Sequence, residues 1–102
     1  TVDGVTAVTN MYVAVGAGGV ILRSTDATTW TAQVSPTTND LLAVTYGTQF
    51  VAVGKAGTIL TSPDGITWTT RTSGTTADLT AILRTLTGYT AVGAAGTVLN
   101  TI

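Results

Sequence analysis

The stretch FVAVGKAGTILTSPDGITWTT, residues 50–70, decides the fold of this chain. It contains an apolar run, a Gly-x-x-Gly turn, a second apolar run, an Asp-Gly turn and a tryptophan. Similar phrases open at Tyr12 and at Tyr89, so that Tyr12, Phe50 and Tyr89 begin three copies that are 38 and 39 residues apart. A period near 40 residues is typical of one supersecondary unit that stacks on copies of itself.

The apolar runs indicate β-strands, because they are short, rich in valine and threonine, and bounded by turn residues. No stretch shows the apolar period of an amphipathic helix. Residues 1–4 are expected to precede the first strand, where they are free to pair with the third repeat of a neighbouring chain. We expect eleven strands, at residues 5–8, 11–15, 20–23, 30–34, 41–46, 49–53, 58–61, 67–72, 79–84, 89–92 and 97–100.

Four short antiparallel strands in about 40 residues are typical of a β-propeller blade. We therefore predict an all-β, single repeat domain of about 2.7 four-stranded blades. Blade 1 covers about residues 1–37, blade 2 about 38–76, and an incomplete blade 3 about 77–102. Because known propellers use about four to eight blades, we expect a homo-oligomer, or neighbouring subunits of an assembly, to complete the ring. The alternative is that the chain is a piece of a longer propeller.

The segment Ser62-Pro63-Asp64-Gly65-Ile66-Thr67-Trp68 resembles the Asp-box, or BNR repeat, of sialidases and related propellers. The segment from Ser24 to Trp30 is a degenerate copy, in which Ala27 stands where a glycine is expected. The phrase around both is similar to repeats of photosystem II assembly-factor-like propellers and their bacterial or phage-borne relatives. The chain departs from the family in having no third box and one residue fewer before the glycine. In that family the boxes usually lie away from the active site, which implies a structural role.

Residue chemistry agrees with a structural role for the boxes. Asp and Ser side chains accept hydrogen bonds from backbone N–H groups one to three residues on. Glycine adopts a positive φ at no steric cost, and the tryptophan packs in the core between blades. We assign this role to Ser24, Asp26, Trp30, Ser62, Asp64, Gly65 and Trp68.

A Gly-x-x-Gly pair follows the second strand of every repeat. Each pair precedes another strand rather than a helix, so there is no helix N-terminus to bind a phosphate. We therefore interpret the pairs as hairpin turns, formed by Gly16, Gly19, Gly54, Gly57, Gly93 and Gly96.

The composition excludes several kinds of site. Charged residues make up 9% of the chain and the net charge is -1, so there is no basic patch for a nucleic acid. Histidine, cysteine and glutamate are absent, which excludes a Ser-His or Cys-His nucleophile and a histidine or thiolate metal site. No apolar run approaches the roughly 20 residues that span a bilayer. We expect no cofactor, no metal site and no membrane insertion.

The resemblance implies sialidase activity, and the residues of this chain do not support that activity. Those enzymes hold a carboxylate with three arginines and use a Tyr–Glu pair and an Asp acid. Here Arg23, Arg71 and Arg84 fall on different strands of successive repeats, and the tyrosines have no glutamate partner. The catalytic residues of the family therefore map onto no positions of this chain, and we expect no enzymatic activity.

We expect a non-enzymatic structural or binding module of an extracellular or virion-surface assembly, because the chain is rich in threonine, poor in lysine and free of cysteine. The alternatives are a lectin-like glycan binder and a fragment of a larger sialidase-like propeller. For a glycan, the candidate residues are Tyr46, the one aromatic ring without an aromatic counterpart in another repeat, and Arg84, which aligns with it. The variable loops 36–40, 73–78 and 84–88 are further candidate recognition sites.

Overall fold

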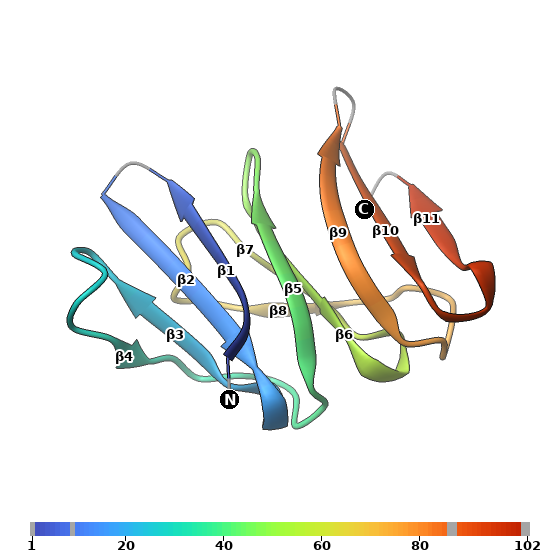
Figure 1. Cartoon of the computed structure of the whole chain (residues 1–102), viewed down its shortest axis with the longest axis horizontal. Coiled ribbons are helices and arrows are strands. Elements are labelled where there is room, and N and C mark those ends of the chain that lie inside the picture. The colour runs from blue at the N-terminus through green and yellow to red at the C-terminus, as the bar shows by residue number, and fades with distance from the viewer. Residues whose placement is uncertain (1, 9, 86–87, 101–102) are drawn as a thin grey trace.

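The computed structural model describes residues 2–8, 10–85 and 88–100. These ranges contain three antiparallel sheets in which the strand order follows the chain (Figure 1). The first sheet contains β1 (Val2–Val8), β2 (Met11–Gly16), β3 (Ile21–Ser24) and β4 (Thr31–Ala32). The middle sheet contains β5 (Leu41–Tyr46), β6 (Phe50–Gly54), β7 (Ile59–Ser62) and β8 (Thr69–Arg71). The third sheet contains β9 (Leu79–Thr85), β10 (Gly88–Gly93) and β11 (Val98–Asn100).

The predicted all-β class and the antiparallel strands are confirmed. Most strand ends lie within one residue of the predicted bounds, and the larger differences are at β1, β4 and β8. The expectation that residues 1–4 precede the first strand is wrong for Val2 to Gly4, because Val2 and Gly4 pair with β2 around a bulge. These residues are therefore already paired within their own sheet. The fourth strands β4 and β8 are also shorter than expected, and each pairs with a single neighbour, β3 or β7.

Three single 3-10 turns, η1 (Ala17–Gly19), η2 (Lys55–Gly57) and η3 (Ala94–Gly96), connect the second and third strands of the sheets. Each turn, together with the glycine that ends the preceding strand, forms a Gly-x-x-Gly motif. In each motif the N–H of the first glycine donates to the carbonyl that follows the turn, at 3.0–3.1 Å. No helix in the described ranges is long and apolar enough to cross a bilayer.

The core consists of two apolar layers between successive sheets. The first layer joins side chains of the first sheet to side chains of the middle sheet, and these are Val13, Val15, Ile21, Leu41, Val44, Phe50, Ala52, Leu60 and Trp68. The second layer joins the middle and third sheets through Val51, Val53, Ile59, Leu79, Tyr89 and Ala91. Strand β6 contributes to both layers and is buried along its whole length, so the middle sheet is covered on both faces.

The first strands of the three sheets contact one another. Strand β1 contacts β5, and β5 contacts β9, so that these three strands lie side by side (Figure 1). Within the described part of the chain no strand pairs with a strand of another sheet. The sheets therefore associate through side chains rather than through a shared hydrogen-bond ladder.

Candidate functional site

The second Ser-x-Asp turn (residues 62–68) satisfies its own backbone donors. The Ser62 hydroxyl accepts hydrogen bonds from the N–H groups of Asp64 and Gly65 at 3.3 and 2.8 Å. Oδ1 of Asp64 accepts the N–H groups of Ile66 and Thr67 at 2.8 and 3.0 Å, and also the Ser62 hydroxyl at 3.1 Å. These hydrogen bonds, led by that of Thr67, favour the charged form and lower the pKa of Asp64.

The first Ser-x-Asp turn (residues 24–30) is built in the same way. The Ser24 hydroxyl accepts the N–H groups of Asp26 and Ala27 at 3.2 and 2.8 Å. Oδ1 of Asp26 accepts the N–H groups of Thr28 and Thr29 at 2.8 and 2.9 Å, and the hydrogen bond from Thr29 is the main cause of the lowered pKa of Asp26. In both turns the carboxylate oxygen is engaged by its own loop, which suits a turn-stabilising role better than a reactive one.

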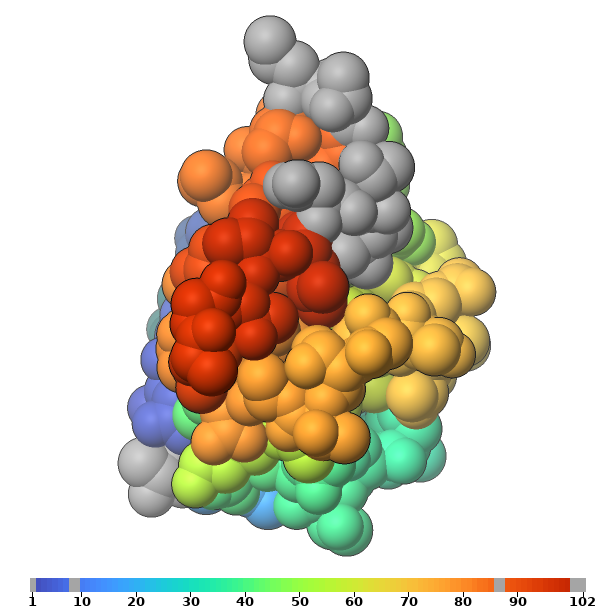
Figure 2. Space-filling view, turned by 90° about the vertical axis from the view of Figure 1, so that its right-hand side faces the viewer, coloured from blue at the N-terminus to red at the C-terminus, as the bar shows by residue number. Residues whose placement is uncertain are grey.

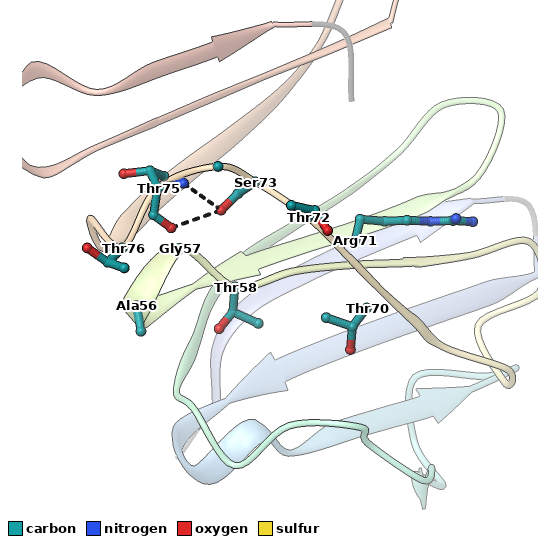
Figure 3. A pocket seen from close by; sticks show the side chains of 10 residues that line it. Ala56, Gly57, Thr58, Thr70, Arg71, Thr72, Ser73, Thr75 and Thr76 are labelled. Carbon is teal, nitrogen blue, oxygen red and sulfur yellow. Dashed lines mark hydrogen bonds between the residues drawn. The ribbon is translucent and has the colours of Figure 1, made fainter.

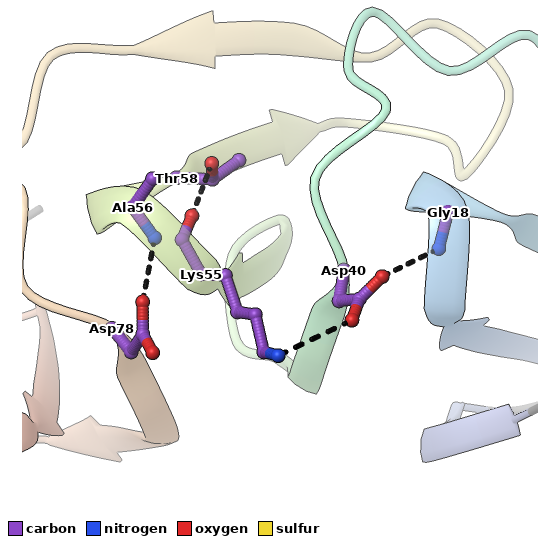
Figure 4. A network of polar contacts seen from close by, with 6 residues as sticks. All are labelled: Gly18, Asp40, Lys55, Ala56, Thr58 and Asp78. Atoms are coloured by element: carbon purple, nitrogen blue, oxygen red, sulfur yellow. Dashed lines mark hydrogen bonds and ion pairs between the residues drawn. The ribbon is translucent and has the colours of Figure 1, made fainter.

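Two aspartates that the sequence analysis did not single out connect neighbouring sheets. Oδ1 of Asp40 accepts the N–H of Gly18 in η1 at 2.8 Å (Figure 4). The backbone carbonyl of Asp40 accepts the N–H of Lys55 at 2.9 Å. Each inter-sheet aspartate thus joins the 3-10 turn of the preceding sheet to the turn of its own sheet. The hydrogen bond from Gly18, followed by the charge of Lys55, lowers the pKa of Asp40.

Asp78 makes the equivalent contacts one repeat later. Its Oδ1 accepts the N–H of Ala56 at 2.9 Å (Figure 4). Its backbone carbonyl accepts the N–H of Ala94 at 2.9 Å. The signal in the sequence is an Asp-Leu dipeptide that recurs after 38 residues, at Asp40 and Asp78. The ion pair of Lys55 with Asp40, at 3.6 Å, is exposed and adds little stability.

The two predicted glycan residues lie on either side of one turn. Tyr46 and Arg84 pair with Phe50 and Tyr89 in their own sheets, so the two residues have the same position in the strand register. The Tyr46 ring is partly buried and packs edge-on against Phe50 with centroids 4.6 Å apart. The Arg84 side chain lies over Gly47, since a Cβ on that glycine would be 2.7 Å from Cδ of the arginine.

A second polar surface is an open groove of about 690 Å³ on the middle sheet (Figure 3). It extends from η2 across β8 to the loop that follows, one of the variable loops that the sequence analysis marked for recognition. Most of its lining residues carry a hydroxyl group, and Arg71 is its one basic residue. The lining residues are Ala56, Gly57, Thr58, Thr70, Arg71, Thr72, Ser73, Gly74, Thr75 and Thr76.

Part of this groove is preorganised by internal hydrogen bonds. The Ser73 hydroxyl donates to the carbonyl of Thr75 at 3.0 Å and accepts its N–H at 3.3 Å. Nε of Arg71 donates to the hydroxyl of Thr61 at 2.8 Å, which holds the guanidinium along the strand. The groove therefore presents several hydroxyl groups and one fixed cation to solvent, a chemistry that suits a polyhydroxylated ligand.

The structure gives less support to a sialidase-type arginine cluster or to a metal site. The three arginines lie on three different sheets, Arg23 on β3, Arg71 on β8 and Arg84 on β9. Nowhere in the described ranges do three acidic side chains come together to hold a metal ion.

No protein-family model matches this chain, and no curated protein or solved structure is significantly similar to it. The likeness to Asp-box propellers therefore stays a prediction from the motifs alone.

Proposed function

We propose that this chain is a non-enzymatic β-propeller module, in which each sheet is a blade, and that it serves as a structural or binding component of an extracellular or virion-surface assembly. The observation that carries the proposal is the repetition of one sheet-to-sheet arrangement. Val13, Val15 and Ile21 face the middle sheet, and their register equivalents Val51, Val53 and Ile59 face the third sheet in the same way. A face-to-face relation that repeats is the one that builds a propeller.

The polar contacts between sheets repeat as well. Asp40 binds the first 3-10 turn as Asp78 binds the second, at 2.8 and 2.9 Å. Because the apolar layer and the polar contact recur together, the third sheet packs on the middle sheet in the same way as the middle sheet packs on the first. A sheet-to-sheet relation that repeats supports a propeller rather than a single two-sheet sandwich.

The proposal of a non-enzymatic role rests on where four of the five aspartates are. Asp26 and Asp64 are bound within their own turns, and Asp40 and Asp78 each bind a turn of the neighbouring sheet. A general acid or base needs a carboxylate that faces a substrate and has its pKa near the working pH. Three of these four carboxylates instead have a lowered pKa and remain charged.

Imaging and an activity assay test the proposal. Negative-stain electron microscopy of the purified protein should show ring-shaped particles, and antibodies against the chain should label intact cells or virions that carry it. A fluorogenic sialoside should not be hydrolysed. Turnover by the wild-type chain that disappears in the Asp64→Asn variant would contradict the non-enzymatic role.

A second candidate function, glycan binding, is favoured by the hydroxyl-lined groove around Arg71. A glycan array tests it, with Arg71→Gln and Arg84→Gln as matched variants, since each removes one arginine from a different candidate surface. Binding lost in the Arg71→Gln variant and kept in Arg84→Gln would assign the groove. The opposite result would assign the turn between Tyr46 and Arg84, and no binding by the wild type would exclude both surfaces for the glycans on the array.

A further inference from the structure

We infer that the outer faces of the first and third sheets are the two halves of one head-to-tail interface, and that a second copy of this chain occupies it. The inference rests on the proposed propeller and specifies its partner and its contact residues. The half on the third sheet is called the rear face, and the half on the first sheet the front face.

The rear face lacks the covering that its equivalents have. Val98 pairs with Val92 as Ile21 pairs with Val15 and as Ile59 pairs with Val53. Ile21 and Ile59 are 1% and 2% exposed because the next sheet lies over them, whereas Val98 is 57% exposed. Val92 is 38% exposed beside it. Figure 2 shows residues of β10 and β11, in red, on the outer side of the molecule.

The rear face also carries a third exposed aliphatic side chain, that of Leu83. Leu83 takes the register position that Thr45 has in the middle sheet, and it is 65% exposed. A large aliphatic side chain thus replaces a threonine on the one face of the third sheet that no other described sheet covers. Adjacent exposed aliphatic side chains of this kind mark an interaction surface.

The front face likewise lacks the covering sheet that its equivalent in the middle sheet has. Val5 pairs with Ala14 as Val44 pairs with Ala52, and Val44 is 9% exposed against 57% for Val5. Val44 belongs to the first apolar layer, where it packs against the rear of the first sheet. Val5 has the same position on a sheet that has no described neighbour on that side.

A hydrogen bond of the internal interface has an unused counterpart on the front face. In the third sheet the Tyr89 hydroxyl accepts the N–H of Gln49 at 3.1 Å and donates to its carbonyl at 2.9 Å, which ties the sheet to its predecessor. Tyr12 is the equivalent residue of the first sheet, and its hydroxyl has no hydrogen-bond partner among residues 2–8, 10–85 and 88–100. A preceding blade would supply backbone groups to this hydroxyl.

A second copy fits because the chain already contains the required interface twice. The front of the middle sheet packs on the rear of the first, and the front of the third packs on the rear of the middle. The front of one copy therefore finds on the rear of another the kind of surface that its own sheets use. The contact is heterologous, and the blade rotation lets it close into a ring.

Two charge-introducing variants and a matched control test this interface by analytical ultracentrifugation over a range of concentrations. We expect the wild type to sediment as a closed oligomer of the 10.3 kDa chain. Val5→Lys damages the front face alone and Val98→Lys damages the rear face alone, and each should raise the apparent dissociation constant by about 100-fold or more, since an unpaired charge would be buried. Ile66→Lys, an exposed apolar residue of the middle sheet, should leave association unchanged.

Mixing the two damaged variants gives the sharpest result. The front of Val98→Lys and the rear of Val5→Lys are both intact, so the mixture should form a one-to-one pair although neither variant associates alone. Self-association of either single variant at wild-type strength would overturn the head-to-tail arrangement, and so would a mixture that stays monomeric.

The failure of this inference can be told from a failure of the proposed propeller. A wild type that is monomeric at every concentration, with slow amide exchange retained along β6, would refute the second copy and leave the stacked blades standing. Such a result would mean that blades outside these 102 residues, or another protein, cover the two faces. Fast exchange along β6 would refute the stacking itself and both proposals with it.

Discussion

The two Ser-x-Asp turns have nearly the same hydrogen bonds and differ in the tryptophan that follows them. Trp68 is 8% exposed, donates its indole N–H to the Gly65 carbonyl at 3.0 Å, and packs on Phe50 with ring centroids 6.3 Å apart. Trp30 is only partly buried and meets Tyr12 edge-on at 6.4 Å. In the described part of the chain, the Trp30 indole makes no hydrogen bond like that of Trp68.

The difference shows that the backbone of the turn and the burial of its tryptophan have separate causes. Neighbouring side chains within the turn determine its backbone, because Ser24 and Asp26 reproduce the contacts of Ser62 and Asp64 without any covering sheet. A sheet on the other side determines how deeply the tryptophan is buried. The turn is therefore a local structure, whereas the tryptophan reports whether its blade has a neighbour.

The largest effect that we expect comes from removing the indole of each turn. We expect Trp68→Ala to lower the free energy of unfolding by about 3–5 kcal/mol, because it empties part of the first apolar layer. Trp30→Ala should cost about 1–2 kcal/mol, because less apolar surface is lost from a partly buried position. Urea unfolding followed by far-UV circular dichroism measures both, at concentrations where the variants share one association state. Equal losses would mean that Trp30 is as fully covered as Trp68.

A smaller effect is expected from exchanging the residues that differ between the turns. Gly65 has φ +78°, and a Cβ there would lie 3.2 Å from Cγ2 of Val13, so Gly65→Ala should destabilise by about 1–2 kcal/mol. Ala27 has φ 62° at the same place. Ala27→Gly should therefore stabilise, by about 0.5 kcal/mol, because relief of the left-handed backbone is partly offset by the greater entropy of glycine in the unfolded chain.

The same urea unfolding experiments measure the change in unfolding free energy for both substitutions. A destabilising Ala27→Gly would show that the alanine methyl group makes a contact worth more than the backbone strain. A neutral Gly65→Ala would show that the second turn relaxes away from Val13 without loss of its own hydrogen bonds.

The strand pattern was predictable because it depends on neighbours in the chain. Alternating turn residues and valine-rich runs placed β5 at the bounds observed, Leu41–Tyr46. The start of β1 was missed because Asp3 and Gly4 are poor strand formers, and their pairing depends on a bulge and on the close approach of β5. A Cβ on Gly4 would lie 3.0 Å from Cα of Ala43, which is a tertiary reason that no local pattern contains.

The polar sites were less predictable, for a related reason. Asp40 and Asp78 act on backbone groups 22 residues away, so their role appears only when two sheets lie side by side. The groove around Arg71 likewise needs η2, β8 and the following loop in one place. The Ser-x-Asp turns were foreseeable, since the backbone hydrogen bonds that their serine and aspartate side chains accept span two or three residues.

The smallest effect we predict is a shared sensitivity to acid. Hydrogen bonds from backbone N–H groups, first those of Thr29 and Thr67, lower the pKa of Asp26 and of Asp64 from the usual 3.8. A lowered pKa in the folded state means that the stabilisation is complete above the unfolded pKa and is lost as the pH falls through the folded value. The free energy of unfolding should therefore decrease from about pH 5 to about pH 2.

Substitution by asparagine separates charge from hydrogen bonding in this test, because Asn keeps an acceptor oxygen and does not titrate. Asp26→Asn and Asp64→Asn should each flatten the dependence of the unfolding free energy on pH, and by similar amounts, since the two carboxylates accept equivalent bonds. Asp40 keeps a lowered pKa in both variants and leaves some acid sensitivity in the double variant. A flattening confined to Asp64→Asn would mean that burial of the neighbouring tryptophan also strengthens the turn. The hydrogen bonds of the turn and the burial of its tryptophan would then not be independent.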